Sequence, residues 1–242
     1  MLILSCKDYN DALNSLAKAY SASIDAIKSA QNTWIKDEAI KQPSQTPNLL
    51  MHIYAELGGK DYHFDLAKYY HRAACFNKTT FIENGLLSAR DGAVLFLAQL
   101  SRFIIKDDTK KIKTLALQKL IHRLSSEPES GGPHAFTSYD EAHFASKSGL
   151  NYSIPEFFQD FIYENQDKFS YDFEKIISDN FKQCIVEFSA TPECKETYIR
   201  DLWRYCILVN TKGYKPDNYH LSGHKGKGTP INPDQILDIY FI

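Results

Sequence analysis

The order of the hydrophobic patterns along the chain limits the possible folds more than any other feature. Apolar residues recur every three or four positions early in the chain, whereas the β-branched and aromatic runs that predict strands are short and scattered. The predicted helices span residues 7–38, 49–57, 78–85, 92–105, 110–124, 138–145 and 155–181, and the predicted strands 67–73, 134–137, 184–188, 205–209 and 235–242. This order predicts an α+β fold, with a helical layer (1–60) and a main domain (61–242) forming one compact unit.

Composition and charge argue against several classes of protein. Of the 242 residues, 43% are hydrophobic, and 28 Lys+Arg face 30 Asp+Glu, which gives a net charge of −2. A chain so close to neutral is not expected to coat nucleic acid by charge alone. No run approaches the roughly 18 apolar residues of a membrane span, and the first residues lack the basic region of a signal peptide. We therefore expect no membrane partner and a cytoplasmic location.

The cysteines and histidines show no metal-binding pattern. The five cysteines include no CxxC pair, which predicts free thiols in a reducing compartment, although Cys184 and Cys194 could bridge. His220 and His224 are four residues apart, but Gly223 between them argues against a helical pair of ligands. We therefore predict no metal site.

A histidine near the end of a predicted strand is the first candidate for a site residue. The run Tyr69–Ala73 is short and aromatic, and the helix that follows it is predicted to end at Gly85. In this position the side chain of His71 could reach a ribose hydroxyl while the adjacent backbone faces an amide ligand. A histidine that only completes a hydrogen bond in the core fits the same pattern.

A glycine turn, a short strand and a capped helix follow one another over residues 131–142. Ser138 is an N-cap candidate and Glu141 stands three residues later, which is the spacing of a capping box. An aromatic side chain here could stack on a flat heterocycle, and Thr137 could donate to a carbonyl group. The alternative is a surface hairpin that packs its aromatic side chains into the core.

The remaining candidates are charged. The glycine-rich loop 211–230 holds Lys212, Lys215, Lys225 and Lys227 against one acid, which indicates binding of phosphate or a nucleic-acid backbone, or else a solvated loop. The helix predicted over 110–124 also has a basic face. Glu187 lies in an apolar strand, where a carboxylate could act as a base or stabilise a cation. A half-exposed strand residue is the alternative for Glu187.

Three segments together resemble the ADP-ribosyltransferase superfamily. Tyr70-His71-Arg72-Ala73 and the following Thr80–Leu86 resemble the family's first strand, aromatic-His-Gly-Thr, and a helix ending in Ile-x-x-x-Gly-Leu. Gly132–Ser138, leading to Ala142–Ala145, resembles the second signature, and Thr229–Ile236 resembles the step before the last strand. The first pair of motifs is found in poly-ADP-ribose polymerases, DNA-targeting toxins and tRNA 2′-phosphotransferases.

The resemblance implies a split β-sheet core with helical insertions, and NAD as the cofactor. It implies that ADP-ribose is transferred from NAD to a macromolecular acceptor, either a protein or a nucleic acid. Small members of the family are often bacterial toxins or phage-defence effectors, which implies an antitoxin or another inhibitor as a further partner. The alternative is a non-catalytic module that binds NAD, RNA or a protein.

The resemblance also implies roles for individual residues. Glu187 is the implied acid that polarises a ribose hydroxyl, and His71 is the implied residue on the ribose of the adenosine half. The residues implied to bind NAD are His71, Arg72, His134, Phe136, Thr137, Tyr139 and Lys225.

The chain departs from the family pattern at three places. Arg72 and Ala73 replace a small pair, and neither His134 nor Phe136 is the tyrosine of the second signature. The sequence at 227–229 is Lys-Gly-Thr, where the family has its catalytic acid. The acid therefore comes from elsewhere, with Glu187 as the first candidate, or the chemistry differs. A basic residue at this place is similar to the 2′-phosphotransferase branch, which uses arginines.

Overall fold

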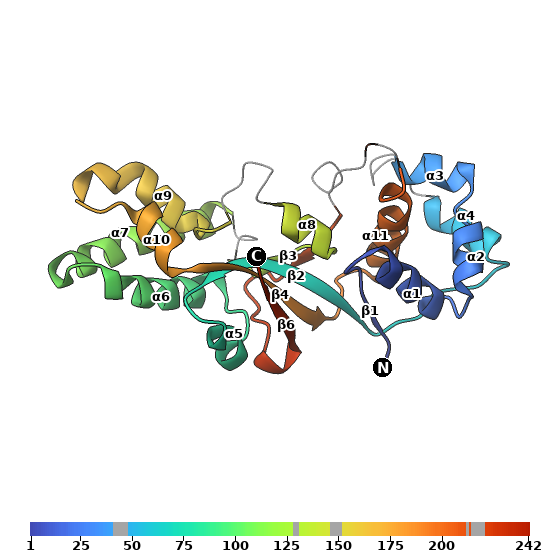
Figure 1. Ribbon diagram of the computed structural model, residues 1–242, viewed down its shortest axis with the longest axis horizontal. Helices are drawn as coiled ribbons and strands as arrows, with labels where there is room; N and C mark the ends of the chain where they lie inside the picture. Colours follow the sequence, from blue (N-terminus) through green and yellow to red (C-terminus); the bar gives the residue numbers. More distant parts are fainter. Residues whose placement is uncertain (41–47, 128–130, 146–151, 212, 214–220) are drawn as a thin grey trace. The chain divides into compact units, whose positions relative to one another are not determined.

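The computed structural model describes residues 1–40, 48–127, 131–145, 152–211, 213 and 221–242 (Figure 1). In chain order its elements are β1 (Ile3–Leu4), α1 (Tyr9–Ala19), α2 (Ile24–Ser29), α3 (Thr33–Ile40), α4 (Leu49–Glu56), β2 (Leu66–Cys75), α5 (Thr79–Asn84), α6 (Ala89–Leu100), η2 (Ser101–Phe103), α7 (Lys106–Ser126), β3 (His134–Ala135), α8 (Tyr139–Phe144), α9 (Glu156–Asn165), η5 (Gln166–Lys168), α10 (Phe173–Asn180), β4 (Lys182–Ala190), α11 (Lys195–Leu208), β5 (His224–Lys225), η7 (Pro233–Gln235) and β6 (Ile236–Phe241). The prediction that helices and short strands mix in one fold is confirmed.

The long helix predicted over 7–38 is three shorter helices. The Oγ of Ser23 accepts a hydrogen bond from the backbone N–H of Ala26 at 3.1 Å and begins α2. The Oδ1 of Asn32 accepts one from the N–H of Ile35 at 3.0 Å at the start of α3. These polar side chains serve as N-caps, so they divide a stretch whose apolar periodicity alone looks continuous.

Two other predictions of secondary structure are wrong. Residues 205–209 are not a strand, because Tyr205–Leu208 form the last turn of α11. The single helix predicted over 155–181 is instead α9, η5 and α10, and the carboxylate of Asp172 caps α10 by accepting from the N–H of Lys175 at 2.9 Å.

The described part of the chain contains two sheets. The larger has the strand order β1-β2-β4-β6, and the smaller pairs β3 with β5. β1 is parallel to β2, whereas β4 is antiparallel to β6, with Cys184 opposite Phe241 and a bulge between Glu187 and Phe188. The larger sheet is therefore mixed, and the specific ADP-ribosyltransferase arrangement stays a prediction.

Backbone contacts divide the chain into two compact units. Unit 1 comprises Met1–Tyr70, Phe136–Phe144 and Ser189–His224, and unit 2 comprises His71–Ala135, Ala145–Phe188 and Lys225–Ile242. Residues 1–60, where we expect a helical layer, belong to unit 1 together with these later segments. Strands β2 and β4 each begin in one unit and end in the other.

Helix α11 is the centre of unit 1. Almost every side chain from Tyr198 to Leu208 is buried, so α11 is covered on all sides and not on one stripe only. It packs against α1 and α3 (Figure 1), and the ring of Trp203 meets that of Tyr20 edge-on at 6.0 Å. Because α11 is buried on all sides, its apolar residues do not form a single helical stripe in the sequence.

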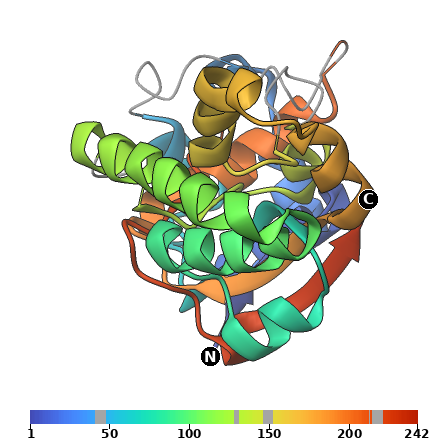
Figure 2. The ribbon, with the colours of Figure 1, turned by 90° about the vertical axis from the view of Figure 1, so that its left-hand side faces the viewer.

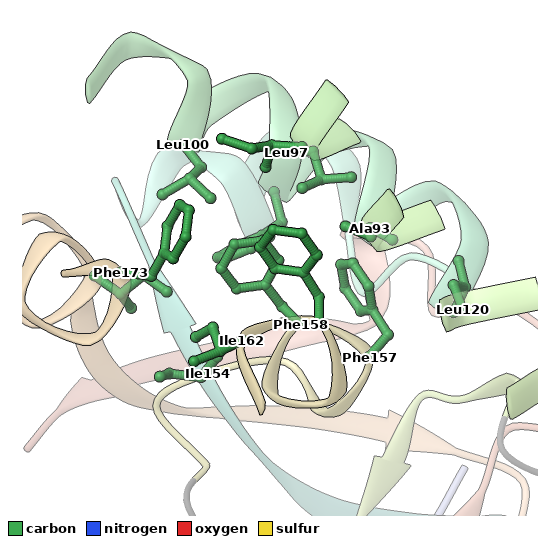
Figure 3. Close-up of a cluster of buried hydrophobic side chains, with 14 of the residues drawn as sticks. Ala93, Leu97, Leu100, Leu120, Ile154, Phe157, Phe158, Ile162 and Phe173 are labelled. Carbon is green, nitrogen blue, oxygen red and sulfur yellow. The ribbon is translucent and has the colours of Figure 1, made fainter. Parts of the chain in front are cut away.

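The core of unit 2 is aromatic and lies between helices. Helix α7 runs alongside α6 and packs on α9 (Figure 2). Side chains of α9 point toward α6 in Figure 3, where Phe158 lies among Leu97, Leu100 and Phe173. The ring centroid of Phe158 lies 5.2 Å from that of Phe96 and 4.9 Å from that of Phe161. These distances are typical of favourable aromatic pairs.

All five cysteines are free thiols, of which Cys194 is exposed and the others are buried. The Sγ atoms of Cys75 and Cys184 lie 3.8 Å apart, without a bond between them. Among the helices that the structure describes, none combines the length and apolar character needed to cross a bilayer.

Candidate functional site

His71 is anchored by one ring nitrogen. It lies half-buried in β2, and its Nδ1 is 2.5 Å from the carbonyl oxygen of His134, within unit 2. A carbonyl can only accept, so this contact places a proton on Nδ1. The second resembling segment therefore orients the ring of His71.

Backbone pairing joins the three segments on which the family resemblance rests. In unit 1, Tyr70 and Phe136 exchange two hydrogen bonds of 3.0 and 2.9 Å. In unit 2, Leu86 and Ile231 exchange two of 2.9 Å each. The first segment therefore meets the second at its strand and meets the third at the end of its helix.

Two glycines permit these close approaches. Gly85 has a φ of 69°, and a Cβ on it would lie 1.9 Å from the carbonyl oxygen of Ile231. A Cβ on Gly226 would lie 2.6–2.7 Å from Pro133, whose carbonyl accepts the N–H of Gly226 at 2.9 Å. Only glycine fits at either position. Gly226 lies in the end of the basic loop, and Gly85 contacts Ile231, which follows the loop.

The candidate stacking residues lie in unit 1, on and just before α8. Phe136 and Tyr139 are half-buried, and the ring of Tyr139 stands edge-on to Tyr70 at 5.9 Å and stacks on His143. Thr137 is buried, and its Oγ1 accepts the N–H of Gly223 at 3.1 Å. Thr137 therefore holds the protein's own backbone, whereas Phe136 and Tyr139 keep part of their rings accessible.

Three consecutive backbone N–H groups are held by buried side chains in unit 1. The N–H of Leu221 donates to Glu141 Oε1 at 2.8 Å, that of Ser222 to Asp201 Oδ2 at 2.7 Å, and that of Gly223 to Thr137. Glu141 also accepts from the backbone and hydroxyl of Ser138, which confirms the predicted capping box. We call Thr137, Glu141 and Asp201 the loop clamp, because they fix the chain where the loop returns.

The two carboxyl groups of the loop clamp have strongly raised pKa values. Burial, with a smaller contribution from the nearby charge of Asp201, raises the pKa of Glu141 from 4.5 to about 7, although the hydrogen bonds from Leu221 and Ser138 oppose this shift. Burial likewise raises the pKa of Asp201 from 3.8 to about 6, although the N–H of Ser222 and the guanidinium of Arg204 oppose this shift. Both groups therefore hold protons that they would lose in the unfolded chain.

This predicts that stability falls as the pH rises through the window from 5 to 7. In that window the folded protein retains the proton of Glu141, whereas the unfolded chain has released it, and each such proton changes the free energy of unfolding by about 1.4 kcal/mol per pH unit. Urea unfolding at pH 5, 6, 7 and 8 measures the slope. Glu141→Gln keeps an oxygen acceptor for Leu221 and should show a shallower slope. Equal slopes in the two proteins would refute the assignment.

Glu187 is buried, and the alternative of a half-exposed residue is wrong. It is 3% exposed, and the hydroxyl of Tyr240 donates to its Oε2 at 2.5 Å across the β4–β6 pair. Burial, followed by this contact, raises the pKa of Tyr240 above its ordinary value. The phenol therefore stays protonated and serves Glu187 as a donor.

Side chains alternate along β2 and β4, and this separates Glu187 from His71. Cys75 and Cys184 touch and so share one face of the sheet, whereas Arg72 Nη2 donates to Gln183 Oε1 at 2.5 Å on the other. Counting in steps of two puts Glu187 on the face of Gln183 and His71 on the face of Cys75. The two residues to which the resemblance assigns catalysis therefore point to opposite sides.

Arg72 and Lys225 differ in exposure. Arg72 is 6% exposed and is fixed by Gln183, which in turn donates to Ser153 Oγ at 2.5 Å. Lys225, in β5, is exposed. Of the two cations that the resemblance offers to a diphosphate, Lys225 is the one a ligand can reach.

Sequence reasoning missed several residues of this region. Asp201 escapes notice because it lies within α11, a helix that the sequence did not predict, and Glu141 was singled out only as a cap. Gln183 and Tyr240 contact Arg72 and Glu187, respectively, and these contacts become visible only after the strands are paired. Lys212, Lys215 and His220 lie outside the described residues.

Comparison with known proteins leaves the family open. No protein-family model matches the chain, and neither the curated proteins nor the solved structures include a significant match. Within the described ranges, no group of three or more His, Cys, Asp or Glu side chains is arranged to hold a metal ion.

Proposed function

We propose that this chain is an NAD-dependent ADP-ribosyltransferase that modifies a macromolecule at an anionic group such as a phosphate. The observation that carries the proposal is the pairing of the three resembling segments, Tyr70 with Phe136 and Leu86 with Ile231. These segments are far apart in the sequence, and a shared site requires them to meet. Their pairing supports the proposal because it meets that requirement.

The residues around His71 suit NAD as a substrate. The imidazole of His71, half-buried beside the carbonyl of His134, suits a hydrogen bond to a ribose hydroxyl. In the same unit, the exposed side chain of Lys225 suits the charge of the diphosphate. The buried Arg72 has no part in this arrangement.

The transfer breaks the bond between nicotinamide and ribose. Its electron pair leaves with neutral nicotinamide, and an acceptor oxygen forms the new bond to the same ribose carbon. A protein accelerates this step by holding NAD bent and by positioning the acceptor, since orientation alone can lower a barrier by several kcal/mol. His71 and Lys225 would supply the holding contacts.

The basic character of the region favours an anionic acceptor. The exposed Lys227 stands where the family has its acid, and the exposed Lys225 lies two residues before it. Glu187 lies on the opposite face of the sheet from His71. A neutral hydroxyl needs a base to remove its proton, whereas a phosphate oxygen is already a nucleophile. Lysines attract a phosphate group, whereas a carboxylate at the same place would repel it. We therefore assign no step to Glu187.

The proposal is tested by incubating the protein with NAD labelled in its adenosine half, with total RNA, phosphorylated DNA or cell lysate. Free nicotinamide and label on the macromolecule are measured together. We expect both products, and expect phosphatase treatment of the acceptor to abolish the labelling. Nicotinamide without label would indicate a hydrolase. Neither product, with no rise in melting temperature on adding NAD, would favour the alternative of a partner-binding module.

A further inference from the structure

A groove on α7 carries positive charge that the fold does not neutralise. Lys106, Lys110 and Lys113 line a hollow of about 490 Å³ between η2, the start of α7 and the middle of that helix. Three hydroxyl residues and the aliphatic Ile104 and Leu117 complete its lining. We call this hollow the lysine groove; it lies wholly within unit 2.

The two halves of α7 differ in how their charges are paired. Near its end, Lys119 pairs with Glu164, and Arg123 pairs with Glu156 at 2.9 Å and with Asp160 at 3.0 Å, all on α9. Among the described residues, no carboxylate pairs with the ammonium of Lys106, Lys110 or Lys113. Asp108 accepts the hydroxyl of Tyr171 at 2.9 Å, and Asp107 is exposed. The lysines of α7 that line the groove, and that have no carboxylate partner among the described residues, therefore lie in its first half.

Stability of the helix does not explain this placement. The N-terminal end of a helix carries a partial positive charge, so lysines in the first turns are unfavourable there and favourable at the other end. Lys106 is the first residue of α7, and Lys110 lies one turn later. Asp107 and Asp108 in the first turn offset part of this repulsion, and a ligand with negative charge in the groove would relieve the rest.

The spacing and chemistry of the lining fit a nucleic-acid backbone. With a helical rise of about 1.5 Å per residue, Lys106 and Lys113 are roughly 10 Å apart along the axis, which is the length of about three nucleotides in one strand of a duplex. The hydroxyls of Ser101, Thr109 and Thr114 donate to carbonyls of their own helices, which leaves the ammonium groups as donors. The lining has no aromatic, Arg, Asn or Gln side chain, the types that read bases.

We infer that the lysine groove binds the phosphate backbone of a nucleic acid without sequence preference. The site is separate in sequence from His71 and the segments paired with it, and it requires no NAD. An acidic protein is the competing partner, because lysines alone would also attract carboxylates.

The test measures salt dependence of binding to a labelled 20-base-pair DNA duplex by fluorescence anisotropy, without NAD. Each phosphate contact contributes a slope of about −0.9 to log K against log salt. The slope measured for the triple variant Lys106→Gln, Lys110→Gln, Lys113→Gln should therefore be less negative than that of the unmodified protein by about 3. The control removes the same charge from unit 1 by Lys18→Gln, Lys28→Gln, Lys36→Gln, all exposed, and should keep the slope.

Three results would overturn the inference. The first is no binding of the duplex at low salt by the unmodified protein. The second is an equal loss of slope in both triple variants, which would show attraction by net charge alone. The third is binding of poly-glutamate with the same dependence on the groove lysines, which would assign the groove to acidic proteins. Circular dichroism of both variants confirms that they are folded before binding is compared.

Discussion

Replacing His71 by alanine is expected to remove the response of the protein to NAD. The substitution deletes the imidazole that the proposed function assigns to the ribose and also the contact of Nδ1 with the carbonyl of His134. The loss of a hydrogen bond to a ligand, with its partner left unpaired, weakens binding by about 10- to 100-fold. The NAD-induced rise in melting temperature should disappear, and nicotinamide release per unit of NAD should fall by a similar factor.

Two further variants separate binding from general damage. His63→Ala removes an exposed histidine of unit 1 and should leave the NAD response unchanged. Glu187→Gln keeps the size of the buried side chain and an oxygen acceptor for Tyr240. Because Glu187 lies on the other face of the sheet from His71, this variant should retain both NAD binding and nicotinamide release. Retained binding with lost release would make Glu187 the acid and would remove the need for an anionic acceptor.

The sequence predicts those parts of the site that depend on local chemistry. The spacing of Ser138 and Glu141 predicts a capping box, and both hydrogen bonds of that motif are present. The short aromatic run around His71 predicts the strand β2, and Gly85 predicts the end of α5. The capping box and the end of α5 depend on atoms within a few residues of one another, and β2 is predicted by the β propensity of its own residues, so the local pattern carries the information.

Features that depend on distant contacts do not appear in the sequence. Asp201 is not recognised as a site residue from the sequence, yet it is buried and holds the N–H of Ser222, in a helix that packs against α1 and α3. The apolar run around Glu187 indicates a buried strand. The contacts of Gln183 and Cys184 with β2 are needed to tell which face of the sheet carries the carboxylate. The relation between His71 and Glu187 could not be obtained from one strand alone.

Replacing Phe158 by alanine is expected to destabilise unit 2 by about 3–5 kcal/mol. Phe158 is fully buried, and its ring meets those of Phe96, Phe161 and Phe173 (Figure 3). Truncation removes apolar contact and leaves a cavity that rigid aromatic neighbours cannot fill, which explains the size of the loss. The midpoint of urea unfolding, followed by far-ultraviolet circular dichroism, measures it.

The matched control lies on the same helix. Tyr163 is 92% exposed, and Tyr163→Ala also replaces an aromatic residue of α9 by alanine. Because this substitution removes no buried surface, its effect on the free energy of unfolding should stay within about 0.5 kcal/mol. Both tryptophans, Trp34 and Trp203, belong to unit 1, so their fluorescence reports on that unit separately. A fall in the dichroism midpoint that the fluorescence midpoint follows would mean that the two units unfold together. A loss below 1 kcal/mol in Phe158→Ala would show that the aromatic cluster does not form the core of unit 2.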